Sequence, residues 1–176
     1  MDLVCGGFPC QDISVVGTRT GLEGESSGLW TEFARCFREL RPRFVLVENS
    51  PALPVRGLST VLGDLASLGY DAEWDCLPAA AFGATHIRAR TWILAYPVGF
   101  RDGIQEDALC PRGLGVVNSD WWASEPGVRR VDDGIPNRVD RLGVLGNAVV
   151  PQITESIGRT LMGWLTTELS EDKITA

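Results

Sequence analysis

Four side chains in this 176-residue sequence have the types needed for polar catalysis: the thiol of Cys10, the carboxyl group of Glu48 and the guanidinium groups of Arg88 and Arg90. A thiolate can add to an electron-poor carbon, a carboxylic acid can protonate the same molecule, and two cations can hold its negative charge. Together they could activate a carbon conjugated to an electron-poor ring. Carbon 5 of cytosine is such a carbon, because it becomes nucleophilic only after a thiolate adds at carbon 6 while an acid protonates ring nitrogen 3.

Each of these residues also has an ordinary structural interpretation. Most cysteines are small core hydrophobes, but Cys10 follows two glycines and a proline and precedes polar residues, which is not the setting of a core side chain. Glu48, at the end of an apolar run, could cap a helix or lie in solvent. Arg88 and Arg90 alternate, so they could form a pair of anion clamps or ordinary surface ion pairs. The activation of an electron-poor ring is therefore predicted by the four residues in combination and not by any one of them.

The elements that would position these residues follow from apolar runs. Strands are expected at 3–7, 44–47, 70–76 and 91–96, the third half-exposed because polar and apolar residues alternate along it. Apolar residues at helical spacing predict helices over 27–41 and 58–68, with Gly69 as a C-terminal cap, and a helix that starts at Pro151. Strands that alternate with helices predict an α/β fold with a parallel sheet, in which ligands bind at the C-terminal ends of the strands.

Composition restricts the function classes. A net charge of −7 argues against a broadly basic nucleic-acid surface. However, 15 of the 16 basic residues are Arg, whose planar guanidinium group pairs with phosphate or with guanine. GC-rich coding would give the same excess of Arg over Lys. Five cysteines and one histidine favour reduced thiols and indicate no metal site. No apolar run approaches the roughly 20 residues that span a bilayer, and no signal peptide is recognisable, so we expect a cytoplasmic protein without membrane contact.

Four sequence blocks then carry a family resemblance. GFPCQDIS, VLVENSP, HIRART and LGNAVVP occur in this order and resemble the conserved blocks of DNA cytosine-5 methyltransferases. The segment DGIPNRVDRLGVLGNAVVPQ is similar to the ends of compact phage-type members. The resemblance predicts a methyltransferase acting on double-stranded DNA, with S-adenosylmethionine as methyl donor.

The resemblance also implies a role for each site residue. Cys10 would be the nucleophile, Glu48 would protonate or hydrogen-bond the cytosine, and Arg88 and Arg90 would hold the base and a nearby phosphate. Since carbon 6 is hidden inside a duplex, the cytosine would have to be flipped out of the stack.

The resemblance also implies a site for the methyl donor, and the sequence departs from the family pattern at one residue. Asn147, Ala148 and Val149 would line the pocket of S-adenosylmethionine. His86 stands where the family usually has Gln, which puts in doubt the backbone-positioning role of that side chain.

The expected organisation has three parts: a catalytic part of the methyltransferase domain at 1–97, a target-recognition insert at 98–140 and a C-terminal methyltransferase segment at 141–176. The insert is irregular and rich in Gly and Pro. Its aromatic and basic pairs could contact DNA or could only hold a small subdomain together; these pairs are Trp121 with Trp122 and Arg129 with Arg130.

The donor-binding front of the fold is not recognisable. Gly24–Gly28 is glycine-bearing but follows no predicted strand, whereas a doubly wound sheet binds its cofactor at the Gly-rich turn after its first strand. We therefore expect an incomplete doubly wound, Rossmann-like methyltransferase sheet that lacks its first strands and exposes the apolar edge of 3–7, to be completed by a missing N-terminal segment or a complementing polypeptide.

Two alternatives from other classes stay open. The chain could be an inactive DNA-binding remnant or one subunit of a split methyltransferase. A thiol oxidoreductase is suggested by Cys5 and Cys10, although their spacing is not Cys-x-x-Cys.

Overall fold

The computed structural model describes residues 1–8, 29–84, 86–101, 107–109 and 148–171. The chain divides into two compact units. The first consists of Met1–Pro78 with Arg88–Arg112, and the second of Ala79–Ile87 with Gly113–Ala176. In the part of the chain that the structure describes, no helix is long and apolar enough to cross a membrane.

The first unit contains a four-stranded sheet with the strand order β1-β2-β4-β3. The bounds are Leu3–Gly7 for β1, Phe44–Asn49 for β2, Tyr70–Pro78 for β3 and Ala89–Pro97 for β4. These elements confirm the α/β class and all four predicted strands. β1 is parallel to β2, but β4 is antiparallel to both β2 and β3, so the expectation of a parallel sheet is wrong for β4, which runs opposite to the other three strands.

The connection between β3 and β4 explains this antiparallel pairing. Its described residues form only the short 3₁₀ helix η2, Ala79–Phe82. A parallel pair needs a crossover of a dozen or more residues, usually a helix, to return the chain to the same end of the sheet. The sheet is therefore mixed.

Burial along the strands follows their place in the sheet. The central strands β2 and β4 carry near-continuous apolar runs, and Val45, Val47, Ile93 and Ala95 are completely buried. At one edge, β3 is only partly buried: Tyr70 and Leu77 are buried, whereas Trp74, expected on the apolar face of an alternating strand, is 43% exposed. At the other edge, β1 pairs with β2 alone among the described strands, and most of β1 is exposed.

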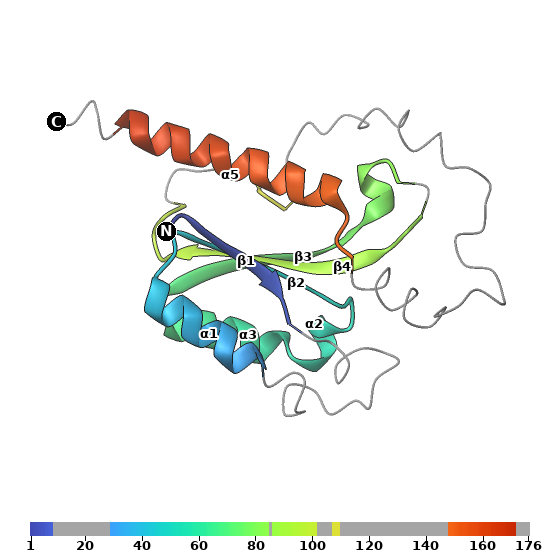
Figure 1. Cartoon of the computed structure of the whole chain (residues 1–176), viewed down its shortest axis with the longest axis horizontal. Helices are drawn as coiled ribbons and strands as arrows, with labels where there is room; N and C mark the ends of the chain where they lie inside the picture. The colour runs from blue at the N-terminus through green and yellow to red at the C-terminus, as the bar shows by residue number, and fades with distance from the viewer. Residues whose placement is uncertain (9–28, 85, 102–106, 110–147, 172–176) are drawn as a thin grey trace, which may run out of the picture. The chain divides into compact units, whose positions relative to one another are not determined.

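Helices α1, Leu29–Leu40, and α3, Leu58–Ser67, lie side by side on one face of the sheet (Figure 1). Both follow the predicted helices, and their apolar stripes bury a common core. The members from these helices are Trp30, Phe37, Leu58, Val61 and Leu65. Gly69 ends α3 with φ at +83°, which confirms the predicted cap.

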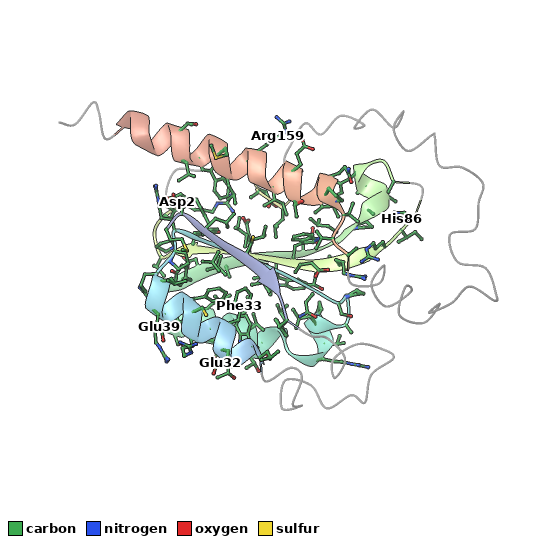
Figure 2. The ribbon with its side chains drawn as sticks, in the orientation of Figure 1. Asp2, Glu32, Phe33, Glu39, His86 and Arg159 are labelled. Atoms are coloured by element: carbon green, nitrogen blue, oxygen red, sulfur yellow. The ribbon has the colours of Figure 1, made fainter. Side chains whose placement is uncertain are left out.

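Polar contacts and close packing fix α1 in place. The indole Nε1 of Trp30 donates a hydrogen bond to Asp64 Oδ2 at 2.8 Å, joining α1 to α3. Figure 2 shows Phe33 between α1 and β1, with Glu32 and Glu39 directed away from the sheet. A Cβ atom at Gly6 would lie 3.1 Å from Phe33 Cζ, so glycine allows α1 to pack closely on β1.

Two further helices complete the described structure. In the first unit, the single turn α2, Leu53–Arg56, follows β2 and was not predicted. In the second unit, α5 spans Pro151–Glu171 and starts at the predicted proline. Its predicted apolar stripe is largely buried, at Ile153, Ile157, Leu161 and Trp164.

Candidate active site

Glu48 lies near the end of β2, where β1 also ends because the two strands are parallel. Gly7 is its partner in the register. A Cβ atom at Gly7 would lie 2.8 Å from the Glu48 carbonyl oxygen and 3.3 Å from Glu48 Oε2. Glycine at this position therefore lets the end of β1, which leads into Phe8 and the segment with Cys10, approach the carboxyl group of Glu48.

Arg90 supplies the charge partner of Glu48 from the neighbouring strand. Its Nε atom lies 3.1 Å from Glu48 Oε1, with 23% of the Arg90 side chain and 19% of the Glu48 side chain exposed. The guanidinium also donates from Nη1 to the Ala89 carbonyl at 2.8 Å, which limits its orientation. Strand β4 starts two residues earlier than predicted, so Arg90 is a strand residue rather than a loop residue.

The pKa values of the site reflect burial and charge acting in opposite directions. Burial raises the pKa of Glu48 above its usual range, while Arg90 and Arg88 oppose the rise. Burial also lowers the pKa of Arg88, as does Arg90, whereas Glu48 raises it. Since each of the two arginines acts on the same carboxyl group, the structure brings together Glu48, Arg88 and Arg90, three of the four predicted catalytic residues.

A network of buried polar groups follows Glu48 and was not predicted. The side chain of Asn49 donates from Nδ2 to the Phe8 carbonyl at 3.3 Å and accepts from the Ser50 amide at 2.7 Å. The hydroxyl of Thr91 donates to the Ser50 carbonyl at 3.0 Å. The sequence does show polar residues directly next to buried apolar strands, which could have indicated such a network. Their hydrogen-bond partners, however, depend on the register between strands that are far apart in the sequence.

Some of the remaining predicted site residues lie outside the described part of the chain, and the others are exposed. Cys10 and Asn147 lie outside the described residues, as do both pairs in the insert, Trp121 with Trp122 and Arg129 with Arg130. In the second unit, Ala148 and Val149 are exposed and lie shortly before α5. His86 is exposed as well (Figure 2). Cys5, the partner in the oxidoreductase alternative, is an exposed free thiol on β1.

Comparison with known proteins shows the family of this chain. The model of the C-5 cytosine-specific DNA methylases matches residues 1–108, which include β1–β4 and the ion pair. The chain belongs to this family.

Relatives of the chain are bacterial and viral methyltransferases. It is 31% identical over 152 residues to the type II methyltransferase M.CviJI of Paramecium bursaria Chlorella virus IL3A, covering 86% of this chain and 40% of the relative. It is 33% identical over 105 residues to M.Sau3AI of Staphylococcus aureus, covering 54% of this chain and 26% of that one. The chain thus spans less than half the length of either relative.

One solved structure is also similar to part of the chain. A DNA modification methyltransferase encoded within an E. coli prophage aligns with a TM-score of 0.49 at 25% identity, over 64% of this chain and 31% of that one.

Proposed function

We propose that this chain carries the catalytic centre of a DNA (cytosine-5)-methyltransferase, which transfers a methyl group from S-adenosylmethionine to carbon 5 of a flipped cytosine in duplex DNA. The observation that carries the proposal is the half-buried carboxyl group of Glu48, which has a raised pKa and is held by Arg90 beside the end of β1. Membership in the family supports this assignment.

The proposed reaction has two stages. The thiolate of Cys10 adds to carbon 6 of cytosine while Glu48 delivers a proton to, or shares one with, ring nitrogen 3, and the electron pair gathers at carbon 5. Carbon 5 takes the methyl group, and S-adenosylhomocysteine is left as the other product. Water, acting as a base, would then remove the carbon 5 proton; the electron pair left behind forms the carbon 5–carbon 6 double bond, the Cys10–carbon 6 bond breaks to release the thiolate, and the proton on ring nitrogen 3 returns to Glu48. Arg90 would hold the Glu48 carboxyl group toward the base, and Arg88 would contact the base or an adjacent phosphate.

The methyl donor supplies an electrophilic methyl group when bound. Ala148 and Val149 are exposed, as residues in contact with a ligand must be before it binds. We propose that these two residues and Asn147 contribute to the donor site, and that duplex DNA is recognised through the insert at 98–140.

The proposal extends to a complementing segment. β1 leaves one edge without a strand partner in the described part of the chain, and the chain covers 40% of M.CviJI. A strand that pairs with this edge, supplied by the same or another polypeptide, would enlarge the sheet and add the Gly-rich donor loop. This favours one part of a larger or split enzyme over an inactive remnant.

The decisive test of the mechanism is trapping with DNA that carries 5-fluorocytosine, using the chain supplied with a complete donor site. Wild-type protein should form a covalent adduct after methyl transfer, because fluorine cannot leave as a proton does. Cys10→Ser should form none, whereas Cys5→Ser, which removes an exposed thiol from β1, should still form it. An adduct with Cys10→Ser would overturn the assignment of the nucleophile.

A further inference from the structure

Thr91 lies where the ladder between β2 and β4 ends. Its register partner is Asn49, the last residue of β2. The next carbonyl group, that of Ser50, accepts from the Thr91 hydroxyl at 3.0 Å. Thr91 is completely buried and Ser50 is 9% exposed, so solvent has little access to replace this hydrogen bond. The hydroxyl thus orients the peptide between Ser50 and Pro51.

The same turn holds the side chain of Asn49. The Ser50 amide donates to Asn49 Oδ1 at 2.7 Å, which directs the opposite end of the carboxamide, Nδ2, to the Phe8 carbonyl at 3.3 Å. Asn49 is 2% exposed. These contacts form a continuous path from β4, through the turn after β2, to the residue that follows β1.

The path runs beside the ion pair of the site. Thr91 is adjacent in the chain to Arg90, which contacts Glu48 at 3.1 Å, while Asn49 follows Glu48 directly. One short segment of β4 therefore contacts both the carboxyl group and the turn behind it. Phe8, at the far end of the path, precedes Pro9 and Cys10 in the sequence.

We propose that Thr91 is a positioning residue: its hydroxyl holds the peptide between Ser50 and Pro51 so that Asn49 anchors the backbone at Phe8, and thereby sets where the chain leaves β1 relative to Glu48. The link to catalysis rests on the proposed function, but the link between Thr91 and the turn does not. Thr91 itself touches no reacting atom.

Hydrogen exchange measured by mass spectrometry on the full chain tests the link to the turn. Thr91→Val keeps the shape but removes the donor, and should speed exchange at the Ser50 and Ala52 amides about five- to tenfold while β2 stays protected. The Ala52 amide is included because it donates to Ser50 Oγ at 3.3 Å. Thr160→Val is the matched control: Thr160 is 8% exposed and donates to the Ser156 carbonyl at 3.4 Å in α5.

Thr91→Ser keeps the hydroxyl and should exchange like wild type, which provides a second measurement should the valine variant fail to fold. Equal exchange at Ser50 in wild type and Thr91→Val, or fast exchange in the serine variant, would overturn the proposal.

The trapping assay then tests the catalytic consequence. With the donor site complete, Thr91→Val should form the 5-fluorocytosine adduct about tenfold more slowly at saturating DNA, with an unchanged Kd for DNA. An unchanged rate would exclude the positioning role in catalysis. A wild-type protein that forms no adduct would count against the proposed function alone, because the exchange result stands independently of activity.

Discussion

At the scale of single residues, the state of Glu48 depends on two opposed effects. Burial disfavours its charged form and raises its pKa, whereas Arg90 and Arg88 favour the charged form. The net rise means that the carboxyl group keeps its proton to a higher pH than an exposed glutamate. A group that must give a proton to a base benefits from this shift, while the arginines limit how far it goes.

Glu48→Gln should slow single-turnover methyl transfer by roughly 10²-fold or more with DNA binding largely intact, because general acid catalysis is typically of that size. Glu39→Gln, which alters an exposed ion pair on α1, is the matched control and should react like wild type. The wild-type rate should also fall as pH rises through the raised pKa of Glu48, because the proton is then lost, and the glutamine variant should lack this decline. A variant with an unchanged rate would remove Glu48 from the mechanism.

At the scale of elements, the close contact between β1 and β2 depends on glycine, which has no side chain, at position 7. A Cβ atom at Gly7 would meet a backbone oxygen at 2.8 Å, which rotation of a side chain cannot relieve. Gly63 in α3 is the opposite case, because nothing lies within 4 Å of a Cβ atom placed there.

Gly7→Ala should therefore destabilise the chain by roughly 1–3 kcal/mol through forced separation of the strands. Gly63→Ala should stabilise it by about 0.4–1 kcal/mol, because alanine reduces the entropy of the unfolded chain and suits a helix. Urea denaturation of both variants measures these free energies of unfolding. If the two substitutions changed the free energy of unfolding in the same direction, the close approach of Gly7 to Glu48 would not be the reason that β1 requires glycine at this position.

A second element-scale feature joins β3 to the start of the insert. Glu73 Oε2 on β3 lies 2.7 Å from Arg101 Nη1, and 18% of the Glu73 side chain is exposed. Burial raises the pKa of Glu73 from 4.5 to about 7; Arg101 opposes this rise and Asp107 adds to it. The folded chain therefore binds this proton more tightly than the unfolded chain.

The resulting stabilisation is fully present below about pH 4.5 and is lost as pH rises through about 7. Relative to Glu73→Gln, wild-type chain should lose about 1–3 kcal/mol between these limits, since one pKa unit corresponds to about 1.4 kcal/mol. Denaturation of both proteins across this range isolates the pH-dependent part from the constant effect of losing the Arg101 contact. A difference that did not vary with pH would show that Glu73 is not protonated preferentially in the folded chain.

At the scale of the whole molecule, the exposed strand β1 has consequences for solubility and donor binding. Leu3 is 40% exposed, and β1 has a strand on one side only in the described regions. Such an edge can pair with other chains. The 176-residue chain alone should accordingly be prone to aggregation.

The isolated chain should bind S-adenosylmethionine weakly or not at all and should not methylate DNA. Adding a segment that supplies a further strand and a Gly-rich loop, fused or as a separate polypeptide, should restore both, because such a loop would supply backbone N–H groups to the donor. Calorimetry and a turnover assay check this. Micromolar donor affinity or turnover without any added segment would show that the donor site is built from this chain alone.

The sequence by itself determined which segments become strands and helices, and to which family the chain belongs. Apolar runs marked all four strands, Gly69 and Pro151 marked helix ends, and conserved blocks carried the resemblance that the family match confirmed. These features are local, because side-chain periodicity and turn chemistry act over a few residues.

Only the tertiary structure decided how those segments pair. The antiparallel orientation of β4, the register that places Asn49 opposite Thr91, and the ion pair between Glu48 and Arg90 join residues about 40 positions apart. The raised pKa of Glu48 arises from the same packing, because burial and the position of two cations are properties of the folded chain. A one-residue change of register would turn these side chains to the other face of the sheet, and no local pattern distinguishes the two arrangements at the polar ends of β2 and β4.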